Sequence, residues 1–102
     1  MRILPEPITF EWDKGNIDKN FIKHKVTNRE TEEIFISDRK FILEDNKHSL
    51  AEKRYMIWGR TNMGRRLTVF FTIRNQKIRI ISARDMHSKE RGEYEKNIKT
   101  GS

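Results

Sequence analysis

The chain has 102 residues, enough for one domain with a single modest core, and 36% of them are charged against 34% that are hydrophobic. Lys and Arg outnumber Asp and Glu by 22 to 15, and the net charge of +7 favours a nucleic acid or an acidic protein as partner. The absence of cysteine excludes disulfides and thiolate chemistry, and no apolar run is long enough to span a membrane.

The N-terminal part of the chain predicts a short strand followed by a helix. The start, MRILPEPITF, is too short and too interrupted by proline for a signal peptide, so we expect a cytoplasmic protein. Ile8 to Trp12 is typical of a strand, and a helix is expected from Lys14 to His24. Within that helix, Ile17 and Phe21 recur with His24 at i, i+4 and i+7, so we expect them to share one buried face.

A second helix and a further strand follow. Thr27 and Glu30 have the spacing of a capping box, which predicts a helix over Asn28 to Phe35. Lys40 to Glu44 (KFILE) predicts a strand, and Asp45 to Ser49 is a polar loop.

The segment from Lys53 to Arg84 predicts three antiparallel strands, because it is rich in β-branched and aromatic residues. Thr61 to Arg65 forms the first connection, in which Gly64 can adopt a positive φ. Asn75 and Gln76 form the second.

A last helix is expected from Asp85 to Lys99, with Tyr94 as a packing anchor. The predicted order is therefore βααββββα, an α+β fold in which two N-terminal helices and a C-terminal helix pack on a largely antiparallel sheet. We treat residues 1–100 as one domain and residues 101–102 as a vector-derived remnant.

Alternation along the three strands divides their side chains between two faces, provided that Arg74 pairs with Lys77 and Arg60 with Arg66. The expected core face carries Tyr55, Ile57, Leu67, Val69, Phe71, Ile73, Ile78, Ile80 and Ser82. The other face carries Arg54, Met56, Trp58, Arg60, Thr68, Phe70, Thr72, Arg74, Lys77, Arg79, Ile81 and Ala83. The second face mixes cations with aromatic rings, which suits phosphates and bases, although a slip of one residue would exchange the two faces.

Several different short motifs are spread over most of the chain, from Phe10 to Tyr94. They include FEWD at residues 10–13, Lys23-His24, Glu44-Asp45 with His48-Ser49, Glu52 with Arg54-Tyr55, Gly59-Arg60, Gly64-Arg65, RIISAR at residues 79–84, and Glu90 with Tyr94. In content and spacing this series resembles the BrnT toxins of bacterial type II toxin–antitoxin systems. One departure is Lys25, which replaces a glycine that usually follows the Lys-His pair. A left-handed lysine costs about 1–2 kcal/mol, so we expect the first helix to end differently here.

The resemblance implies a compact RelE-like fold and an endoribonuclease that inhibits translation. It also implies neutralisation by a BrnA-like antitoxin with a ribbon-helix-helix domain, through which alone the toxin would contact operator DNA. It implies no cofactor. From the residues, a membrane surface is a weaker possibility as partner, because no long basic amphipathic helix is evident, and we expect no membrane partner.

RNA cleavage without a metal needs a base for the 2′-hydroxyl, an acid for the leaving oxygen and cations around the phosphorane. The sequence has no clustered carboxylates or closely spaced histidine pair, so we expect no metal site. His24 and His48 match motif positions and could act as base or acid. The alternatives are that His24 only ends a helix and that His48 is a solvated loop residue.

Arginines on the polar face are the stronger candidates, because guanidinium groups bind phosphate in a bidentate manner. Arg84 falls on the opposite face in this register but lies at a strand end. Glu52 and Glu90 could be acid/base groups or ion-pair partners, and we favour ion pairing. The candidate catalytic residues are Arg60, Arg79, Arg84, His24, His48 and Glu52. The candidate RNA-binding residues are Lys23, Arg54, Trp58, Arg65, Arg74 and Lys77.

Two other classes of function remain open from the residues alone. A non-catalytic nucleic-acid-binding module would bind in a salt-sensitive manner without cleaving. A partner-binding module would use the basic surface only to receive an acidic protein.

Overall fold

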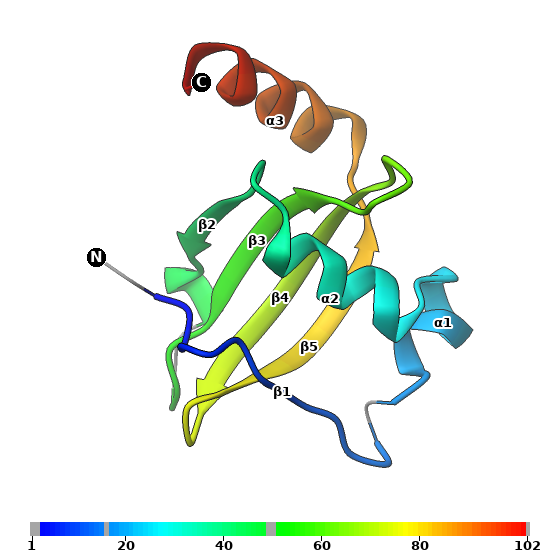
Figure 1. The fold of residues 1–102 in the computed structure, drawn as a ribbon, viewed down its shortest axis with the longest axis vertical. Helices are drawn as coiled ribbons and strands as arrows, with labels where there is room; N and C mark the ends of the chain where they lie inside the picture. Colours follow the sequence, from blue (N-terminus) through cyan, green and yellow to red (C-terminus); the bar gives the residue numbers. More distant parts are fainter. Residues whose placement is uncertain (1–2, 16, 49–50, 102) are drawn as a thin grey trace.

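The computed structural model describes residues 3–15, 17–48 and 51–101, so Asn16, Ser49 and Ser102 of the expected helix, loop and remnant lie outside it. Within these ranges a five-stranded sheet is the centre of the molecule (Figure 1). Its strands are β1 (Phe10–Glu11), β2 (Phe41–Glu44), β3 (Tyr55–Arg60), β4 (Arg66–Arg74) and β5 (Lys77–Asp85). Their spatial order is β1-β5-β4-β3-β2, and only the β1–β5 pair is parallel.

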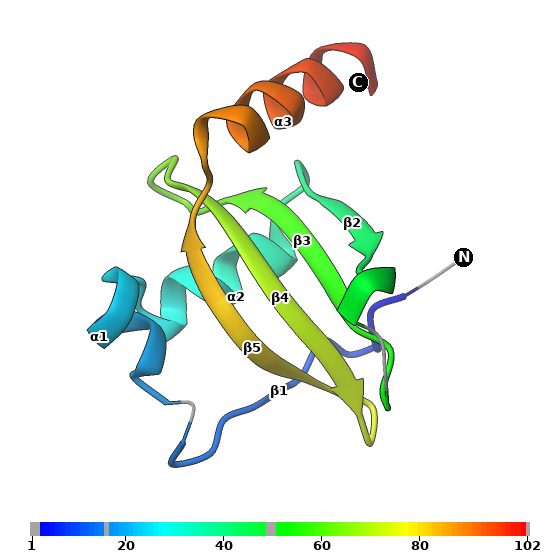
Figure 2. The same ribbon diagram turned by 180° about the vertical axis from the view of Figure 1, so that it is seen from behind.

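Helices α1 (Lys19–His24), α2 (Asn28–Ile36) and α3 (Ser88–Gly101) complete the fold, with one 3-10 turn, η1 (Asn46–His48). Helix α2 crosses one face of the sheet, α1 lies beside β5, and α3 lies beyond the end of β5 (Figures 1 and 2). The order of elements confirms the predicted α+β fold.

Two helices begin later than predicted. Asp13 accepts hydrogen bonds from the N–H groups of Gly15 and Ile17 in a local turn that does not continue as a helix, so α1 begins at Lys19 and not at Lys14. At the other end of the chain, β5 continues to Asp85, so α3 begins at Ser88.

The expected buried face of the first helix is also wrong. Ile17 and Phe21 are both 46% exposed, His24 is half-buried, and the buried residue of α1 is Asn20. The helix therefore contacts the sheet through a polar side chain and turns its larger apolar residues outward.

Lys25 adopts the left-handed conformation that a glycine would take, with φ 58° and ψ 31°, so the prediction that the helix ends differently is wrong. Its N–H donates to the carbonyls of Asn20 and Phe21, and its own carbonyl accepts from Nη1 of Arg65 at 2.8 Å. We attribute the conformation to these bonds, which offset a local cost of about 1–2 kcal/mol.

The core lies between α2 and the sheet. The predicted capping box of Thr27 and Glu30 is present and begins α2, which buries Ile34 and Phe35 completely. The ring of Phe35 packs edge-on against Phe71, with centroids 5.0 Å apart. Gly59 of β3 lets the helix approach closely, because a Cβ there would lie 2.9 Å from Cβ of Ile34.

Both connections of the meander form as expected, since Gly64 has φ 89° and Asn75 and Gln76 both have positive φ. The register differs at one place. Phe70 pairs with Ser82 whereas Phe71 pairs with Ile80, so Ile81 is an extra residue on β5.

This β-bulge moves every later residue of β5 to the other face. Ala83 is fully buried in the core and pairs with Val69, although it was expected on the polar face. Ser82 was expected in the core, but it shares the opposite face with Phe70. Arg84 moves to that same face, where the uninterrupted register could not place it.

Candidate active site

The face of the sheet that points away from α2, here called the distal face, is the region where predicted site residues meet. Figure 2 views the molecule from this side, with the strands in front of α2 and α3 beyond the strand ends. Helix α3 is held there by Tyr94, which is fully buried, packs edge-on against Phe41 and donates from its hydroxyl to the carbonyl of Arg39.

Phe70 lies at the centre of the distal face, between two arginines from neighbouring strands. Cζ of Arg54, just before β3, is 5.4 Å from the centroid of the ring, and Cζ of Arg84, on β5, is 5.8 Å from it. Such contacts hold a guanidinium group over an aromatic ring by cation–π attraction. Two cations are thereby held on one surface, beside the same aromatic ring.

Glu90 of α3 fixes the orientation of Arg84. Its two carboxylate oxygens accept from Nη1 of Arg84 at 2.7 Å and from Nη2 at 3.0 Å. The Thr68 hydroxyl and the His87 N–H donate to the same carboxylate. Burial alone would raise the pKa of Glu90, but these hydrogen bonds lower it to about 2.

The bidentate pair uses one edge of the guanidinium group of Arg84. In the described contacts, Nη1 also donates to the carbonyl of Asp85. The Nε–H and the second Nη2–H therefore remain for a phosphate on the other edge, since a guanidinium group has five donors.

A second arginine is connected to a histidine through a carboxylate. Nε of Arg54 lies 3.5 Å from Oδ2 of Asp45, and Nδ1 of His48 lies 3.1 Å from both oxygens of Asp45. This contact at Nδ1 leaves Nε2 of His48, whose side chain is 59% exposed, to act on a substrate. Asp45 was missing from the predicted site, although its spacing of three residues before His48 could have indicated it.

His48 and Arg54 line one hollow of about 220 Å³ at this part of the distal face. Its lining residues are His48, Ala51, Glu52, Lys53, Arg54, Thr72 and Ile81. Glu52 in turn binds Arg74 at 2.8 Å, and this hydrogen bond lowers the pKa of Glu52, so the carboxyl group stays ionised. Glu52 is thus an ion-pair partner in this structure, as favoured from the sequence.

Arg79 reaches the sheet edge beside β1. Its guanidinium group binds Glu11 at 3.2 Å and Asp13 at 3.0 Å. It pairs with Thr72 across the ladder, so it belongs to the distal face, but two carboxylates hold its charge at the rim.

Other predicted residues lie apart from this cluster. Arg60 contacts Tyr94 and lines a separate hollow of about 490 Å³ with Arg39 and Met63. His24 is at the end of α1, where its carbonyl accepts from Arg65. Trp58 pairs across strands with Phe41, beneath the region that α3 covers.

Arg65 is held in place by hydrogen bonds to carboxylates and backbone carbonyls. It donates to Asp85 at 2.7 Å, to Glu30 at 3.2 Å, and to the carbonyls of residues 24 and 25. The hydrogen bond from Arg65 lowers the pKa of Asp85, so Asp85 stays ionised, and the network joins the turn before β4 to β5, α1 and α2.

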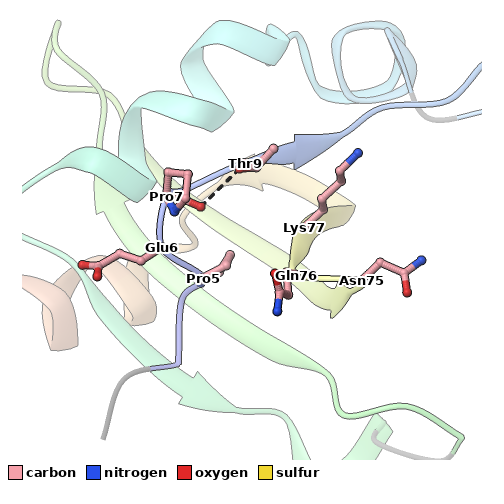
Figure 3. A pocket seen from close by; sticks show the side chains of 7 residues that line it. All are labelled: Pro5, Glu6, Pro7, Thr9, Asn75, Gln76 and Lys77. Atoms are coloured by element: carbon pink, nitrogen blue, oxygen red, sulfur yellow. Dashed lines mark hydrogen bonds between the residues drawn. The ribbon is translucent and has the colours of Figure 1, made fainter.

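Lys23 lines a hollow beside α1, and Lys77 lines another at the β4–β5 turn. Figure 3 shows the latter, of about 360 Å³, between the turn and the N-terminal segment. Its lining residues are Pro5, Glu6, Pro7, Thr9, Asn75, Gln76 and Lys77, which combine one carboxylate and one amine with neutral groups. This set offers neither a histidine base nor paired cations.

In the part of the chain that the structure describes, no three His, Asp or Glu residues come together as ligands for a metal ion. The same ranges hold no helix with the length and apolar character that crossing a membrane requires.

A family model described as "Ribonuclease toxin, BrnT, of type II toxin-antitoxin system" matches residues 12–90. No curated protein sequence gives a significant match. The matched range includes both carboxylate-supported groups of the distal face, the Asp45–His48 pair and the Arg84–Glu90 pair.

Proposed function

The chain belongs to the BrnT family of ribonuclease toxins of type II toxin–antitoxin systems, and from this premise we propose that it cleaves RNA on the distal face without a metal ion. The observation that carries the proposal is the arrangement around Phe70. Arg54 and Arg84 lie over one ring, and Arg54 is connected through Asp45 to His48. Cations for a phosphate and a proton acceptor are therefore neighbours.

The proposed reaction begins when Nε2 of neutral His48 takes the proton of a ribose 2′-hydroxyl. The 2′-oxygen then attacks the adjacent phosphorus, and the bond from phosphorus to the 5′-oxygen of the next nucleotide breaks. Water donates a proton to this leaving oxygen, and the hydroxide that remains takes the proton from the imidazolium of His48, so the products are a 2′,3′-cyclic phosphate and a 5′-hydroxyl end and His48 is neutral again. Asp45 stabilises the imidazolium that forms, as a carboxylate at Nδ1 does in other catalytic histidines.

Arg84 and Arg54 stabilise the charge that develops on the phosphorane. Charge-assisted donors that are oriented before the reaction are worth more than mobile ones, and removing one such donor typically lowers turnover about 10²- to 10³-fold. Glu90 supplies this orientation for Arg84.

In the cell, we propose that cleavage of RNA in the cytoplasm inhibits translation. A ribbon-helix-helix antitoxin would neutralise the protein and would make the contacts to operator DNA. The excess of positive charge supports an RNA substrate, since RNA is a polyanion.

The proposal is tested with the purified protein, RNA and a chelator. We expect cleavage to persist in EDTA, and Arg84→Ala to lower its rate about 10²- to 10³-fold at unchanged far-UV circular dichroism. Arg29→Ala is the matched control, because Arg29 is 88% exposed on α2, away from the distal face, and its replacement should leave the rate unchanged.

His48→Ala tests the base separately, and we expect the rate to fall about 10²- to 10⁴-fold. Full activity of both His48→Ala and Arg84→Ala would contradict the proposed site. Salt-sensitive RNA binding without cleavage products would instead support a non-catalytic binding module.

A further inference from the structure

The outward side of α1 is unusually apolar for a surface helix. In α1, Ile22 is 76% exposed and Phe21 is 46% exposed, whereas the buried residue is Asn20; Ile17, just before the helix, is also 46% exposed. Exposed apolar residues are ordinary when scattered, but a group of them on one short element marks an interaction site.

The polarity of α1 is inverted because the inward side binds the backbone of β5. Oδ1 of Asn20 accepts from the N–H of Ala83 at 3.0 Å, and Nζ of Lys19 donates to the carbonyl of Ile81 at 2.7 Å. These polar side chains form hydrogen bonds with backbone groups of β5 near its bulge. β1 does not reach this part of the strand, because it pairs only with Ile78 and Arg79. The apolar side chains are thus left to face outward.

Lysines surround this apolar group. A hollow of about 360 Å³ is lined by Lys14, Gly15, Ile17, Lys19, Ile22 and Lys23. An RNA strand would be attracted by the lysines but would gain little from Ile17 and Ile22, which offer no ring on which a base can stack. A protein segment that carries both carboxylates and apolar residues complements both features.

We propose that this α1 surface, formed by Ile17, Phe21 and Ile22 with the surrounding Lys14, Lys19 and Lys23, is the docking site for an acidic, amphipathic segment of the antitoxin. The inference rests on the proposed function in taking the antitoxin as partner. Apolar side chains of that segment cover Ile22 and Phe21, and its Asp and Glu side chains meet the lysines.

The position of the α1 surface also gives a means of neutralisation. The carbonyl of Ile81 accepts from Lys19 of α1, and Ile81 lines the hollow that contains His48 and Arg54. A segment bound on α1 therefore lies next to the proposed active site, where its negative charge and its bulk exclude RNA.

Ile22→Asp tests the docking site, and Ile36→Asp is the matched control. Ile36 is the same residue type, is 69% exposed and lies at the end of α2. Each variant is titrated with the purified cognate ribbon-helix-helix antitoxin, and RNA cleavage is measured without antitoxin. We expect Ile22→Asp to weaken antitoxin binding about 30-fold or more and to keep the cleavage rate, while Ile36→Asp changes neither.

Wild-type antitoxin affinity in Ile22→Asp would overturn the inference, as would an equal loss in both variants. It would also be overturned if Ile22→Asp instead abolished self-association or RNA binding, because a second copy or RNA would then be the occupant. A wild-type protein that leaves RNA intact but loses the antitoxin through Ile22→Asp would refute the proposed cleavage and retain the docking site.

Discussion

Phe70 and Phe71 are adjacent in β4 and have opposite environments. Phe71 is fully buried between the rings of Phe35 and Tyr55, under α2. Phe70 is half-buried on the distal face, between the guanidinium groups of Arg54 and Arg84. The comparison shows that alternate side chains of one strand face the core and the proposed site. The residues that neighbour each ring across the sheet therefore decide whether it packs in the core or supports cations.

The bulge at Ile81 sharpens this separation. Without it, Arg84 would point toward the core and Ala83 toward solvent. The extra residue puts a small apolar side chain against Val69 and brings the cation to the ring of Phe70. A single inserted residue thereby fills the core beside Val69 and places a cation on the distal face.

The largest effect is expected from Phe71→Ala. Loss of a fully buried phenyl ring should lower the free energy of unfolding by about 3–5 kcal/mol, because the surrounding side chains relax only partly. Phe70→Ala should cost about 1 kcal/mol of stability but reduce RNA cleavage about tenfold, since the two guanidinium groups lose their common support.

Urea denaturation and cleavage assays on both variants measure this contrast. Activity is compared without urea, at a temperature at which circular dichroism shows each variant to be folded. Equal losses of stability in the two variants would show that the faces do not differ as described.

Gly59→Ala tests the close packing of the core face. The added methyl group would lie 2.9 Å from Cβ of Ile34 and 3.2 Å from its carbonyl oxygen, so we expect a loss of about 1–3 kcal/mol in unfolding free energy. Cleavage per folded molecule should remain, because the methyl group points to α2.

Gly92→Ala is the control for this substitution. Its added Cβ meets no atom within 4 Å, and it lies within α3, so it should stabilise the protein by about 0.5–1 kcal/mol. A stabilised Gly59→Ala variant would contradict the close approach of α2 to β3.

The last effect concerns Glu90 at acid pH. Its folded pKa of about 2 lies below the ordinary value of 4.5, so its contribution is complete above pH 4.5 and is lost as the pH falls toward 2. We expect a contribution on the order of 1–2 kcal/mol after allowance for partial exposure.

The unfolding free energy of the wild type and of Glu90→Gln is compared at intervals between pH 5 and pH 2. The difference between them should be largest at pH 5 and should shrink as the pH falls. A difference that is independent of pH in this window would mean that the charge of Glu90 is not what holds Arg84.

Local patterns were enough to predict most elements of the fold. The capping box placed α2, the positive φ values at Asn75 and Gln76 form the predicted two-residue turn, and alternation separated Phe70 from Phe71. These features depend on neighbours within a few residues, which the sequence displays directly. The motif series also predicted the family that the comparison supports.

Only some of the residues named from the sequence meet at the proposed site. His48, Arg54 and Glu52 were named from the sequence, and they do line one hollow. Arg60, His24 and Arg65 were named with them, but α3 and the ion pairs to Glu30 and Asp85 hold these residues elsewhere. Glu90 was expected to be an ion-pair partner and is one, but the identity of its partner, Arg84, depends on how α3 lies against the end of β5, which spacing along the chain does not show.

By itself the sequence determined the order of elements, the two connections of the meander and a surplus of cations along its strands. Only the tertiary structure decided which cations share a surface, because the bulge at Ile81 reverses the alternation and α1 presents Asn20, not its apolar residues, to β5. Both outcomes depend on satisfying backbone groups of β5 across the sheet edge, an energetic requirement between distant segments that local periodicity does not encode.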